Sequence, residues 1–246
     1  MTGAIMQAYF FPYLGYFQLI EQADEFVLHE FVSFRKRTWM TRNRLIKKGL
    51  DREVMINIPV QKSSSFKLIN EIKISDFESW KRSFLKSIHH DYGKAIYFDG
   101  VYSLIQDCLS DEDSSLHRFN SRCIKKVCQY IGVGTKIISS DKGIFQIEKN
   151  LKERAMRNQL DLKAQRVIDI CRDRGWNSYI NPEGGSKIYR KGDFRKRGIE
   201  IKFWKSELPS YSQSSSKFYP GLSILDVLMH VSPRAVKDML GAGHFF

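Results

Sequence analysis

The chain has 246 residues, a hydrophobic content of 42% and a formal net charge of +13 at pH 7. That length accommodates one large domain, or one domain with an added subdomain, around a substantial core. No window holds the ~18 unbroken apolar residues of a membrane-spanning helix, so we expect no transmembrane segment and a cytoplasmic protein. The positive charge favours anionic partners such as nucleotides, nucleic acids or an acidic membrane surface.

The first thirty residues predict a strand, a helix and a second strand. An apolar strand over Ala4–Ala8 leads into an aromatic loop that Pro12 and Gly15 interrupt, and an apolar helix face follows over Phe17–Ala23 before the strand Phe26–Leu28. The segment lacks the basic leader of a signal peptide, so we expect it to belong to the fold. The loop leads into a helix N-terminus, where a nucleotide phosphate can be held.

The rest of the chain continues to alternate between the two periodicities. Strand patterns occur at 54–59, 68–74, 136–140, 178–180 and 199–204, and helical patterns at 77–93, 100–109, 116–132, 162–175, 223–230 and 233–240. Residues 141–158 are polar and weakly periodic, which predicts a mobile loop or an exposed helix. Ser223 and Ser232 are expected N-caps, and Asp226 completes a spacing like that of a capping box.

This alternation predicts an α/β fold with a mainly parallel, Rossmann-like sheet of the nucleotidylyltransferase or HUP-like kind. The nucleotide-binding core is expected to comprise residues 1–75 and 133–246. The segment 76–132 is mainly helical, and we expect it to be an insertion or cap on that core.

The aromatic loop is the first candidate site. Gln7, Tyr9, Tyr13 and Tyr16 offer hydrogen-bonding groups around a turn that Gly15 keeps tight. A ligand crevice lies beyond the carboxyl ends of the strands in an open α/β sheet, where this loop belongs. The alternative is that the aromatic rings simply seal the core, and for the phenylalanines of the loop we favour that interpretation.

The stretch 12–16 occupies the place of the HxGH-type turn of nucleotidylyltransferases, with tyrosines where that motif has histidines. The phosphate-stabilising cations of the motif are therefore missing. The turn is expected to shape a pocket more than to stabilise charge.

A basic segment over 35–44 is the second candidate. Trp39, Arg42, Asn43 and Arg44 combine an indole and an amide with guanidinium groups, which suits recognition of a phosphate and an adjoining ring. A solvated charged face is the alternative, and we prefer it for the lysines of this region.

The third candidate is the turn over 181–189. Asn181 ends a strand, and Gly184 and Gly185 would let main-chain amides approach an anion at the start of a helix. The turn has neither GxGxxG nor P-loop spacing, so an ordinary strand-to-helix connection explains it equally well.

The remaining chemistry-bearing residues indicate no metal site. The four cysteines have no CxxC pair and are expected to be buried free thiols. The six histidines have no HxxxH or HExxH spacing. Spacing alone supports no Ser-His-Asp arrangement and identifies no catalytic residue.

Five segments carry a resemblance to a known family. They are MQAYFFPYLGYFQLI at 6–20, WMTRNR at 39–44, AIYFD at 95–99, YINPEGG at 179–185 and GLSILD at 221–226. Together they resemble the WbqC-like family over nearly the whole chain, although the commonest family form has proline where this chain has Ala8. The resemblance implies a role in biosynthesis of bacterial O-antigen and related surface polysaccharides, as a cytoplasmic protein that tailors sugar nucleotides.

Residues and resemblance together lead to an expected function. We expect a transferase or ligase, with ATP and magnesium as candidate cofactors, that moves an acyl or aminoacyl group such as glycyl from a small carboxylate donor to a nucleotide-linked amino sugar. In that hypothesis Arg42, Arg44 and the Gly184–Gly185 turn hold phosphates. The alternatives are a non-catalytic nucleic-acid-binding module, and a scaffold of a polysaccharide assembly complex at the membrane face. The sequence does not fix the oligomeric state.

Overall fold

The computed structural model describes residues 1–62, 67–111, 113–155 and 162–246. Its strands are β1 (Thr2–Met6), β2 (Glu25–Leu28), β3 (Arg42–Lys47), β4 (Arg52–Asn57), β5 (Lys136–Ser139), β6 (Ser178–Pro182), β7 (Glu200–Ser206) and β8 (Gly243–Phe245). Its helices are α1 (Leu14–Glu21), α2 (Phe77–Tyr92), α3 (Phe98–Cys108), α4 (Leu116–Ile131), α5 (Lys142–Ala155), α6 (Leu162–Asp173), α7 (Lys191–Arg195), α8 (Ile224–His230) and α9 (Pro233–Met239), with 3-10 turns η1 (Ile69–Glu71) and η2 (Glu183–Lys187).

Six strands form one sheet in the order β5-β2-β1-β6-β7-β8, and β3 pairs with β4 in a separate antiparallel hairpin. Within the sheet only the pair of β7 and β8 is antiparallel. Counted by appearance in the sheet, the strands lie 3-2-1-4-5-6, the order of doubly wound α/β proteins. The α/β fold and the mainly parallel sheet that the sequence predicts are confirmed.

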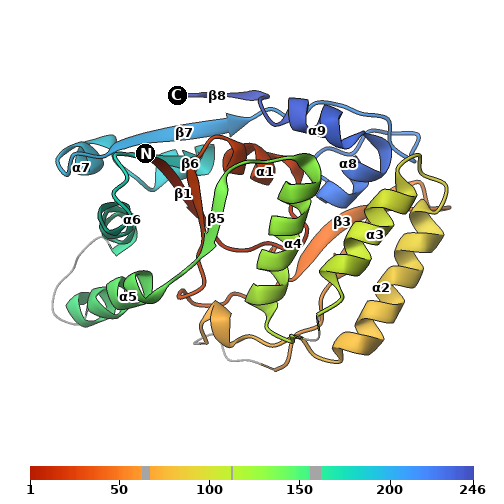
Figure 1. The fold of residues 1–246 in the computed structure, drawn as a ribbon, viewed down its shortest axis with the longest axis horizontal. Helices are drawn as coiled ribbons and strands as arrows, with labels where there is room; N and C mark the ends of the chain where they lie inside the picture. Colours follow the sequence, from red (N-terminus) through yellow and green to blue (C-terminus); the bar gives the residue numbers. More distant parts are fainter. Residues whose placement is uncertain (63–66, 112, 156–161) are drawn as a thin grey trace.

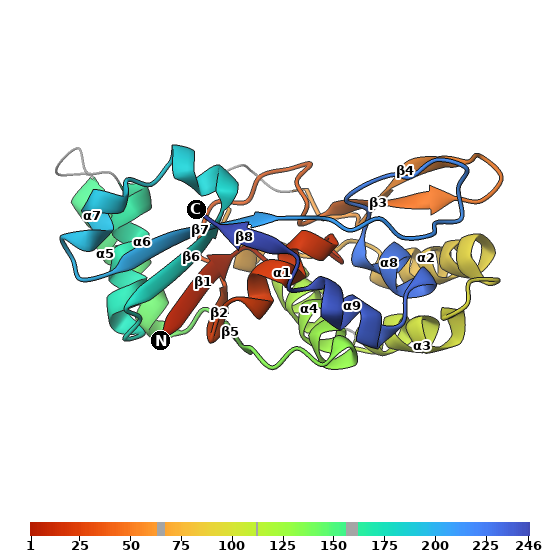
Figure 2. The same ribbon diagram turned by 90° about the horizontal axis from the view of Figure 1, so that it is seen from above.

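Helices cover both faces of the sheet (Figure 1). Helices α5, α6 and α7 lie on one side, and α1 and α4 lie on the other. Two hydrophobic clusters correspond to these faces: alternate residues of β2 divide between them, Phe26 and Leu28 in one and Val27 in the other. Figure 2 shows the same layers from above, with the β3–β4 hairpin beside α8 and α2. Central parallel strands buried on both faces explain the continuous apolar runs of the sequence.

Close packing at the start of the sheet requires a glycine. A Cβ built on Gly3 of β1 would come within 2.0 Å of the indole of Trp176, which is itself buried. The ring of Trp176 therefore lies flat against the β1 main chain, and this contact fixes the segment after α6 against the first strand.

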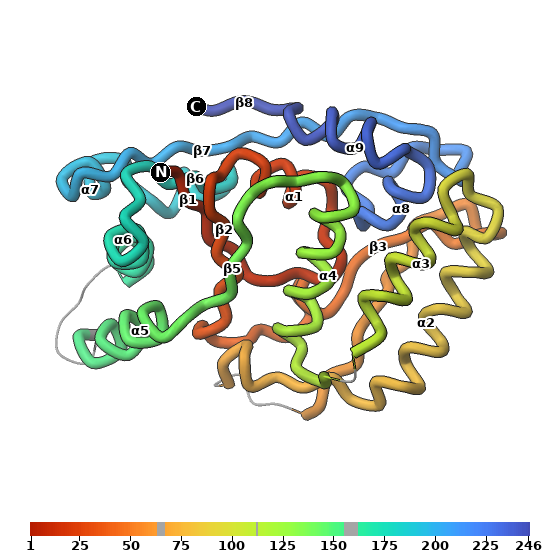
Figure 3. Tube along the Cα trace, in the orientation of Figure 1, coloured from red at the N-terminus to blue at the C-terminus, as the bar shows by residue number. Residues whose placement is uncertain are grey.

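Helices α2, α3 and α4 pack beside α8, α9 and β3 at one end of the molecule (Figure 3). Their apolar residues belong to the same hydrophobic cluster as those of α1. Among the described residues, the helical segment therefore shares its interior with the sheet. Its division from the core at 76 and 132 stays a prediction.

Some local predictions were wrong. Residues 68–74, expected as a strand, form η1 and three isolated bridges, Ser33 to Leu68, Val60 to Ile74 and Lys73 to Ser115. Asp76 precedes α2 as expected, but with a φ of 45° its carboxylate makes no cap hydrogen bond. The strands β3 and β8 were not predicted.

Other local predictions are confirmed. Ser223 and Ser232 cap α8 and α9 with their side chains, each accepting a hydrogen bond from a main-chain amide of the first turn. The segment expected as a loop or exposed helix at 141–158 is helical over Lys142–Ala155, and its last residues lie outside the described ranges.

Candidate functional site

The sheet grows outward from its centre in two directions, and the strand order reverses between β1 and β6. Strands β1, β2 and β5 extend the sheet one way, and β6 and β7 extend it the other. A cavity of about 630 Å³ opens at the carboxyl ends of these strands, where doubly wound folds bind ligands. We call it the switch-point cleft; its lining includes Gln7, Tyr9, His29, Arg35, Arg166, Tyr179, Asn181, Gly184, Gly185, Ile188 and Tyr189.

Side chains from three other elements hold the aromatic loop after β1. The Nδ2 of Asn43 donates to the carbonyls of Phe10 and Phe11, at 3.0 and 2.6 Å. Asn120 of α4 donates to the carbonyl of Ala8 at 3.0 Å, and the Ser223 hydroxyl donates to the carbonyl of Phe11 at 2.7 Å. Loop backbone without a strand partner is thereby satisfied inside the protein, which gives the loop one shape before any ligand arrives.

The turn after β6 depends on one of its two glycines. A Cβ on Gly185 would lie 1.8 Å from Asn181 Oδ1, whereas a Cβ on Gly184 would have no atom within 4 Å. Asn181 itself donates to the Tyr179 hydroxyl at 2.7 Å. Gly185 therefore makes room for the Asn181 amide, whereas Gly184 is exposed and lines the cleft with open space on its Cβ side.

A buried carboxylate anchors one of the cationic side chains of the cleft. Glu148 of α5 accepts hydrogen bonds from both Nε and Nη2 of Arg166, the latter at 3.1 Å, and from His29 Nε2 at 3.0 Å. Burial raises the pKa of the Glu148 carboxyl, but these hydrogen bonds outweigh it and hold the pKa below its usual range. The other nitrogen of His29 lies 3.0 Å from the Ser140 hydroxyl. The Arg166 guanidinium is consequently oriented at the cleft wall, and the exposed Arg35 lines the same cleft.

A second cavity of about 420 Å³ adjoins the cleft. We call it the aromatic pocket; its lining is Tyr9, Pro12, Tyr13, Trp39, Asn43, Arg44, Leu208, Pro220 and Gly221. Tyr9 lines both cavities. Burial raises the pKa of the Tyr9 and Tyr13 hydroxyls, so both rings stay neutral at physiological pH.

Both terminal amino groups of Arg44 are engaged within the protein, whereas its Nε is buried without a hydrogen-bond partner among the described residues. Its Nη1 donates to Glu53 at 2.8 Å, and its Nη2 donates to the carbonyls of Pro220 and Gly221 at 3.2 and 3.1 Å. These contacts join β3 to the loop before α8. Arg44 thus builds the wall of the aromatic pocket.

The structure divides the twelve residues that the sequence suggested. The cleft takes Gln7, Tyr9, Asn181, Gly184 and Gly185, the aromatic pocket takes Tyr9, Tyr13, Trp39, Asn43 and Arg44, and neither cavity is lined by Gly15, Tyr16 or Arg42. Tyr16 is buried and donates to the carbonyl of Gln7 at 2.8 Å, and Gly15 lies against the Tyr13 ring. Arg42 stands beside the aromatic pocket, with its guanidinium carbon 5.8 Å from the centre of the Trp39 ring.

Sequence reasoning missed the basic side chains of the cleft, which are His29, Arg35 and Arg166. His29 follows β2 directly, so the strand-end rule that selected Gln7 could have selected it as well. Arg35 lay in the basic segment without being singled out. Arg166 had no local signal, because only the packing of α6 against α5 directs it to the cleft.

Asp226 is not part of a capping box. Its buried carboxylate accepts hydrogen bonds from the hydroxyls of Tyr92 and Tyr211, at 2.6 and 2.8 Å, and burial raises its pKa. His230 Nδ1 lies 2.8 Å from the main-chain oxygen of Asp226, and its Nε2 lies 2.7 Å from the Ser214 hydroxyl. This network joins α2 and α8 to the loop over residues 210–217, and it contributes no side chain to the switch-point cleft or the aromatic pocket.

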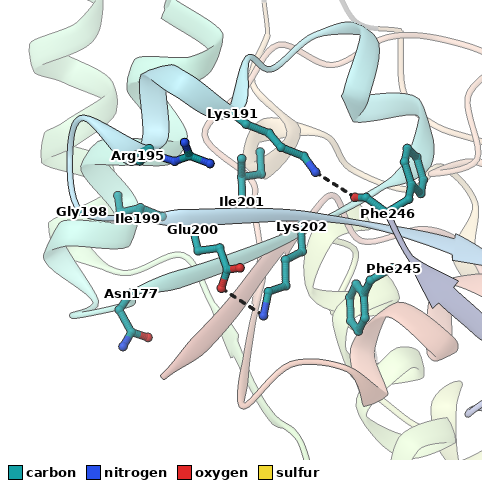
Figure 4. Close-up of a pocket in the computed structure, with 10 residues that line it drawn as sticks. All are labelled: Asn177, Lys191, Arg195, Gly198, Ile199, Glu200, Ile201, Lys202, Phe245 and Phe246. Atoms are coloured by element: carbon teal, nitrogen blue, oxygen red, sulfur yellow. Dashed lines mark hydrogen bonds and ion pairs between the residues drawn. The ribbon is translucent and has the colours of Figure 1, made fainter.

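A third cavity, of about 640 Å³, lies at the far end of the sheet, where β7 begins beside α7 (Figure 4). Its cations are partly engaged: Lys202 pairs with Glu200 at 3.1 Å, and Lys191 donates to the main-chain oxygen of Phe246 at 3.2 Å. It lies at the amino ends of the parallel strands, opposite the edge at which such folds bind ligands.

The four cysteines are all buried free thiols, as expected. Within the described ranges, no group of three or more His, Cys, Asp or Glu side chains could hold a metal ion. In the same part of the chain, none of the helices has the length and apolar character to cross a membrane.

Comparisons with known proteins give the family. Residues 7–238 match the model of the WbqC-like protein family. The chain is also similar to the uncharacterized protein Rv1507c of Mycobacterium tuberculosis, with 25% identity over 235 residues that cover 94% of each chain. No solved structure matches. The chain therefore belongs to the WbqC-like protein family.

Proposed function

We propose that this protein binds a nucleotide-linked amino sugar in the switch-point cleft and transfers an acyl or aminoacyl group, such as glycyl, to the sugar amine. The reaction would be a tailoring step in bacterial surface-polysaccharide biosynthesis. The observation that carries the proposal is the lining of the cleft, in which Arg35, Arg166 and the exposed Gly184 surround the place where doubly wound folds bind nucleotides.

Electrostatics supports phosphate binding at this place. Guanidinium groups form paired hydrogen bonds with phosphate oxygens, and the Arg166 group is held by Glu148 so that little ordering is needed on binding. No Asp or Glu lines the described part of the cleft to repel an anion. Ile188 and the ring of Tyr189 offer apolar surface for a base.

We extend the proposal to ATP as the source of activation for the carboxylate donor. Since the described lining holds no carboxylate, magnesium would be carried by phosphate oxygens and water rather than by a protein cage.

In the transfer step, the sugar nitrogen forms a bond to the acyl carbonyl carbon, the bond from that carbon to its leaving group breaks, and the nitrogen loses a proton. The contribution of the chain is to position both reactants. His29 is engaged with Glu148 and Ser140, so we assign it to orienting Arg166 and leave it outside the proton transfer.

Calorimetry with UDP-glucosamine and UDP tests the binding claim. Arg35→Gln should weaken both ligands about tenfold, the effect of one lost charge-assisted hydrogen bond. Lys36→Gln is the matched control, because it removes one neighbouring exposed charge that does not line the cleft, and it should match the wild type. Equal losses in both variants would show that only net charge attracts the ligand.

Product analysis tests the chemistry. The protein, ATP, magnesium, glycine and UDP-glucosamine should yield a new amide that mass spectrometry detects, together with release of pyrophosphate. The same assay with other small carboxylates defines the donor. A wild-type protein that binds nucleotide sugars but produces no amide with any donor of the panel would contradict the transferase and leave a binding protein.

A further inference from the structure

We propose that the aromatic pocket is the subsite for the sugar ring, and that it distinguishes the sugar nucleotide from the free nucleotide. The inference rests on the proposed function, and it goes beyond it by assigning the two cavities to different parts of one ligand. The phosphates and the nucleoside occupy the switch-point cleft, and the uncharged ring crosses Tyr9 into the neighbouring pocket.

The position of Tyr9 makes one ligand able to use both cavities. Its side chain lines the cleft on one side and the pocket on the other. The ring is held by its contact with Tyr16, with ring centroids 5.4 Å apart, and Tyr16 is fixed in turn by its hydrogen bond to the carbonyl of Gln7. The two cavities therefore meet at a wall of defined position.

The two cavities differ in the charge they offer. In the cleft, the charge of Arg166 is compensated by Glu148, whereas Arg35 is exposed and pairs with no carboxylate of the described residues. In the aromatic pocket, the charge of Arg44 is compensated by Glu53, and its other amino group is bonded to main-chain carbonyls. An anionic group is thus best placed in the cleft, and a neutral group in the pocket.

The Asn43 side-chain amide, which also lines the pocket, makes its hydrogen bonds within the protein. Asn43 gives its amino group to two loop carbonyls, and its oxygen accepts a hydrogen bond from the Arg44 amide at 2.8 Å. What remains for a ligand is mainly ring surface. The Trp39 side chain is 41% exposed and the Tyr13 side chain 36%, and Leu208 closes the pocket.

Such a lining fits a pyranose ring. Exposed indole and phenol rings combine an apolar face, which suits the CH face of a sugar, with a polar edge that can meet its hydroxyl groups. A base could also stack here, since aromatic rings bind base faces. The cleft, with about 630 Å³ and its own apolar walls, already provides for the base, and the pocket of about 420 Å³ is left for the sugar.

Calorimetry on Trp39→Ala decides whether the aromatic pocket binds the sugar ring or the base. The substitution should leave the affinity for UDP unchanged and weaken UDP-glucosamine about tenfold, so that the sugar no longer adds to binding. Trp39→Phe, which retains a ring, should restore most of the difference. Since Trp39 is partly exposed, its loss leaves the core intact, and unchanged thermal unfolding of both variants checks this.

Three results would overturn the assignment. Equal weakening of UDP and UDP-glucosamine by Trp39→Ala would place the base in the aromatic pocket. Unchanged affinity for both ligands would show that the pocket takes no part of either. A wild-type protein that binds neither ligand would defeat the proposed function itself, whereas the first two results leave nucleotide binding in the cleft standing.

Discussion

Asn43 has the sequence setting of a ligand-binding residue, but its side chain supports the loop that lines the candidate site. Its sequence setting, between two arginines and after an indole, suggested recognition of a base or sugar. In the structure its side-chain amide is used three times inside the protein, on Phe10, Phe11 and Arg44. These bonds hold the aromatic loop, in which Phe11 adopts a φ of 37°. The residue shapes both cavities by fixing the loop that separates them.

Asn43→Ala should therefore destabilise the protein by about 1–3 kcal/mol, because it leaves buried carbonyls without their donor. Urea unfolding measures the change. The control is Asn150→Ala on α5, where an exposed Asn accepts a hydrogen bond from Gln146 and the expected change is a few tenths of a kcal/mol. If the two variants unfold at the same urea concentration, Asn43 does not support the loop.

The adjacent glycines of the turn after β6 offer a matched pair. Gly185→Ala places a Cβ against Asn181 Oδ1 and should displace the amide from the cleft, whereas Gly184→Ala meets no atom within 4 Å. We expect Gly185→Ala to cost about 1–3 kcal/mol of stability, as overpacking does, and to abolish measurable UDP binding. Gly184→Ala should retain wild-type stability. Calorimetry and thermal unfolding measure both variants. Equal stability and equal UDP affinity of the two variants would contradict the prediction.

At the scale of elements, a buried ion cluster joins β2 to the segment after α6. Glu25 is 1% exposed, and its carboxylate accepts from Arg174 Nε and Nη2 at 2.8 and 3.1 Å and pairs with Lys136 of β5 at 2.8 Å. The hydrogen bonds from Arg174, aided by Lys136, lower the pKa of Glu25 despite its burial. The cluster ties the edge of the sheet to the helical layer that carries Arg166.

The pH dependence of stability follows from the sign of that shift. Because the pKa of Glu25 is lower in the folded state than the ~4.3 of an unfolded chain, its contribution is present above that value and is lost as the pH falls through the folded pKa. Glu25→Gln should lose about 1–3 kcal/mol near pH 7 through the lost charge-assisted hydrogen bonds, since Arg174 and Lys136 remain accessible to water. Its difference from wild type should shrink below about pH 4.

Urea titrations at several pH values test this prediction. Glu200→Gln, in an exposed pair with Lys202, is the control and should differ from wild type by less than about 1 kcal/mol at every pH. A difference between wild type and Glu25→Gln that stayed constant from about pH 7 to about pH 3 would contradict the role of the cluster.

Elements with strong periodicity were the predictable ones. The helices α2, α4 and α6 and the buried strands β1 and β2 carry their pattern locally, so the sequence predicts them. The strand β3 escaped prediction because its charged residues mask the pattern, although Leu45 and Ile46 are buried. The segment 68–74 has strand-like alternation but lacks a continuous partner strand, so only isolated bridges form.

At the scale of the whole molecule, the place of the site followed from sequence but its composition did not. The rule that ligands lie at strand carboxyl ends selected Gln7 and Asn181, and both residues line one cleft. The rule cannot report which helix side chains reach that cleft, or which arginines are already paired. The sequence therefore carried no sign that Arg166 lines the cleft or that the amino groups of Arg44 are bonded within the protein, because the surroundings of both depend on residues far away in sequence.

The positively charged side chains are distributed differently between the two cavities. The switch-point cleft combines guanidinium groups with the carboxyl edge of the sheet, and the aromatic pocket beside it offers mainly neutral ring surface. The account thus predicts one extended site at one edge of the sheet. The cavity beside β7 and α7 should take no part in it (Figure 4).

Hydrogen–deuterium exchange with and without saturating UDP-glucosamine tests this central claim most directly. The account predicts slower exchange in the peptides that cover residues 5–16 and 180–190, together with the segment around 35–44, and no change over 195–202. Protection confined to 195–202, or no protection in the loop after β1 and the turn after β6, would contradict the assignment of the switch-point cleft.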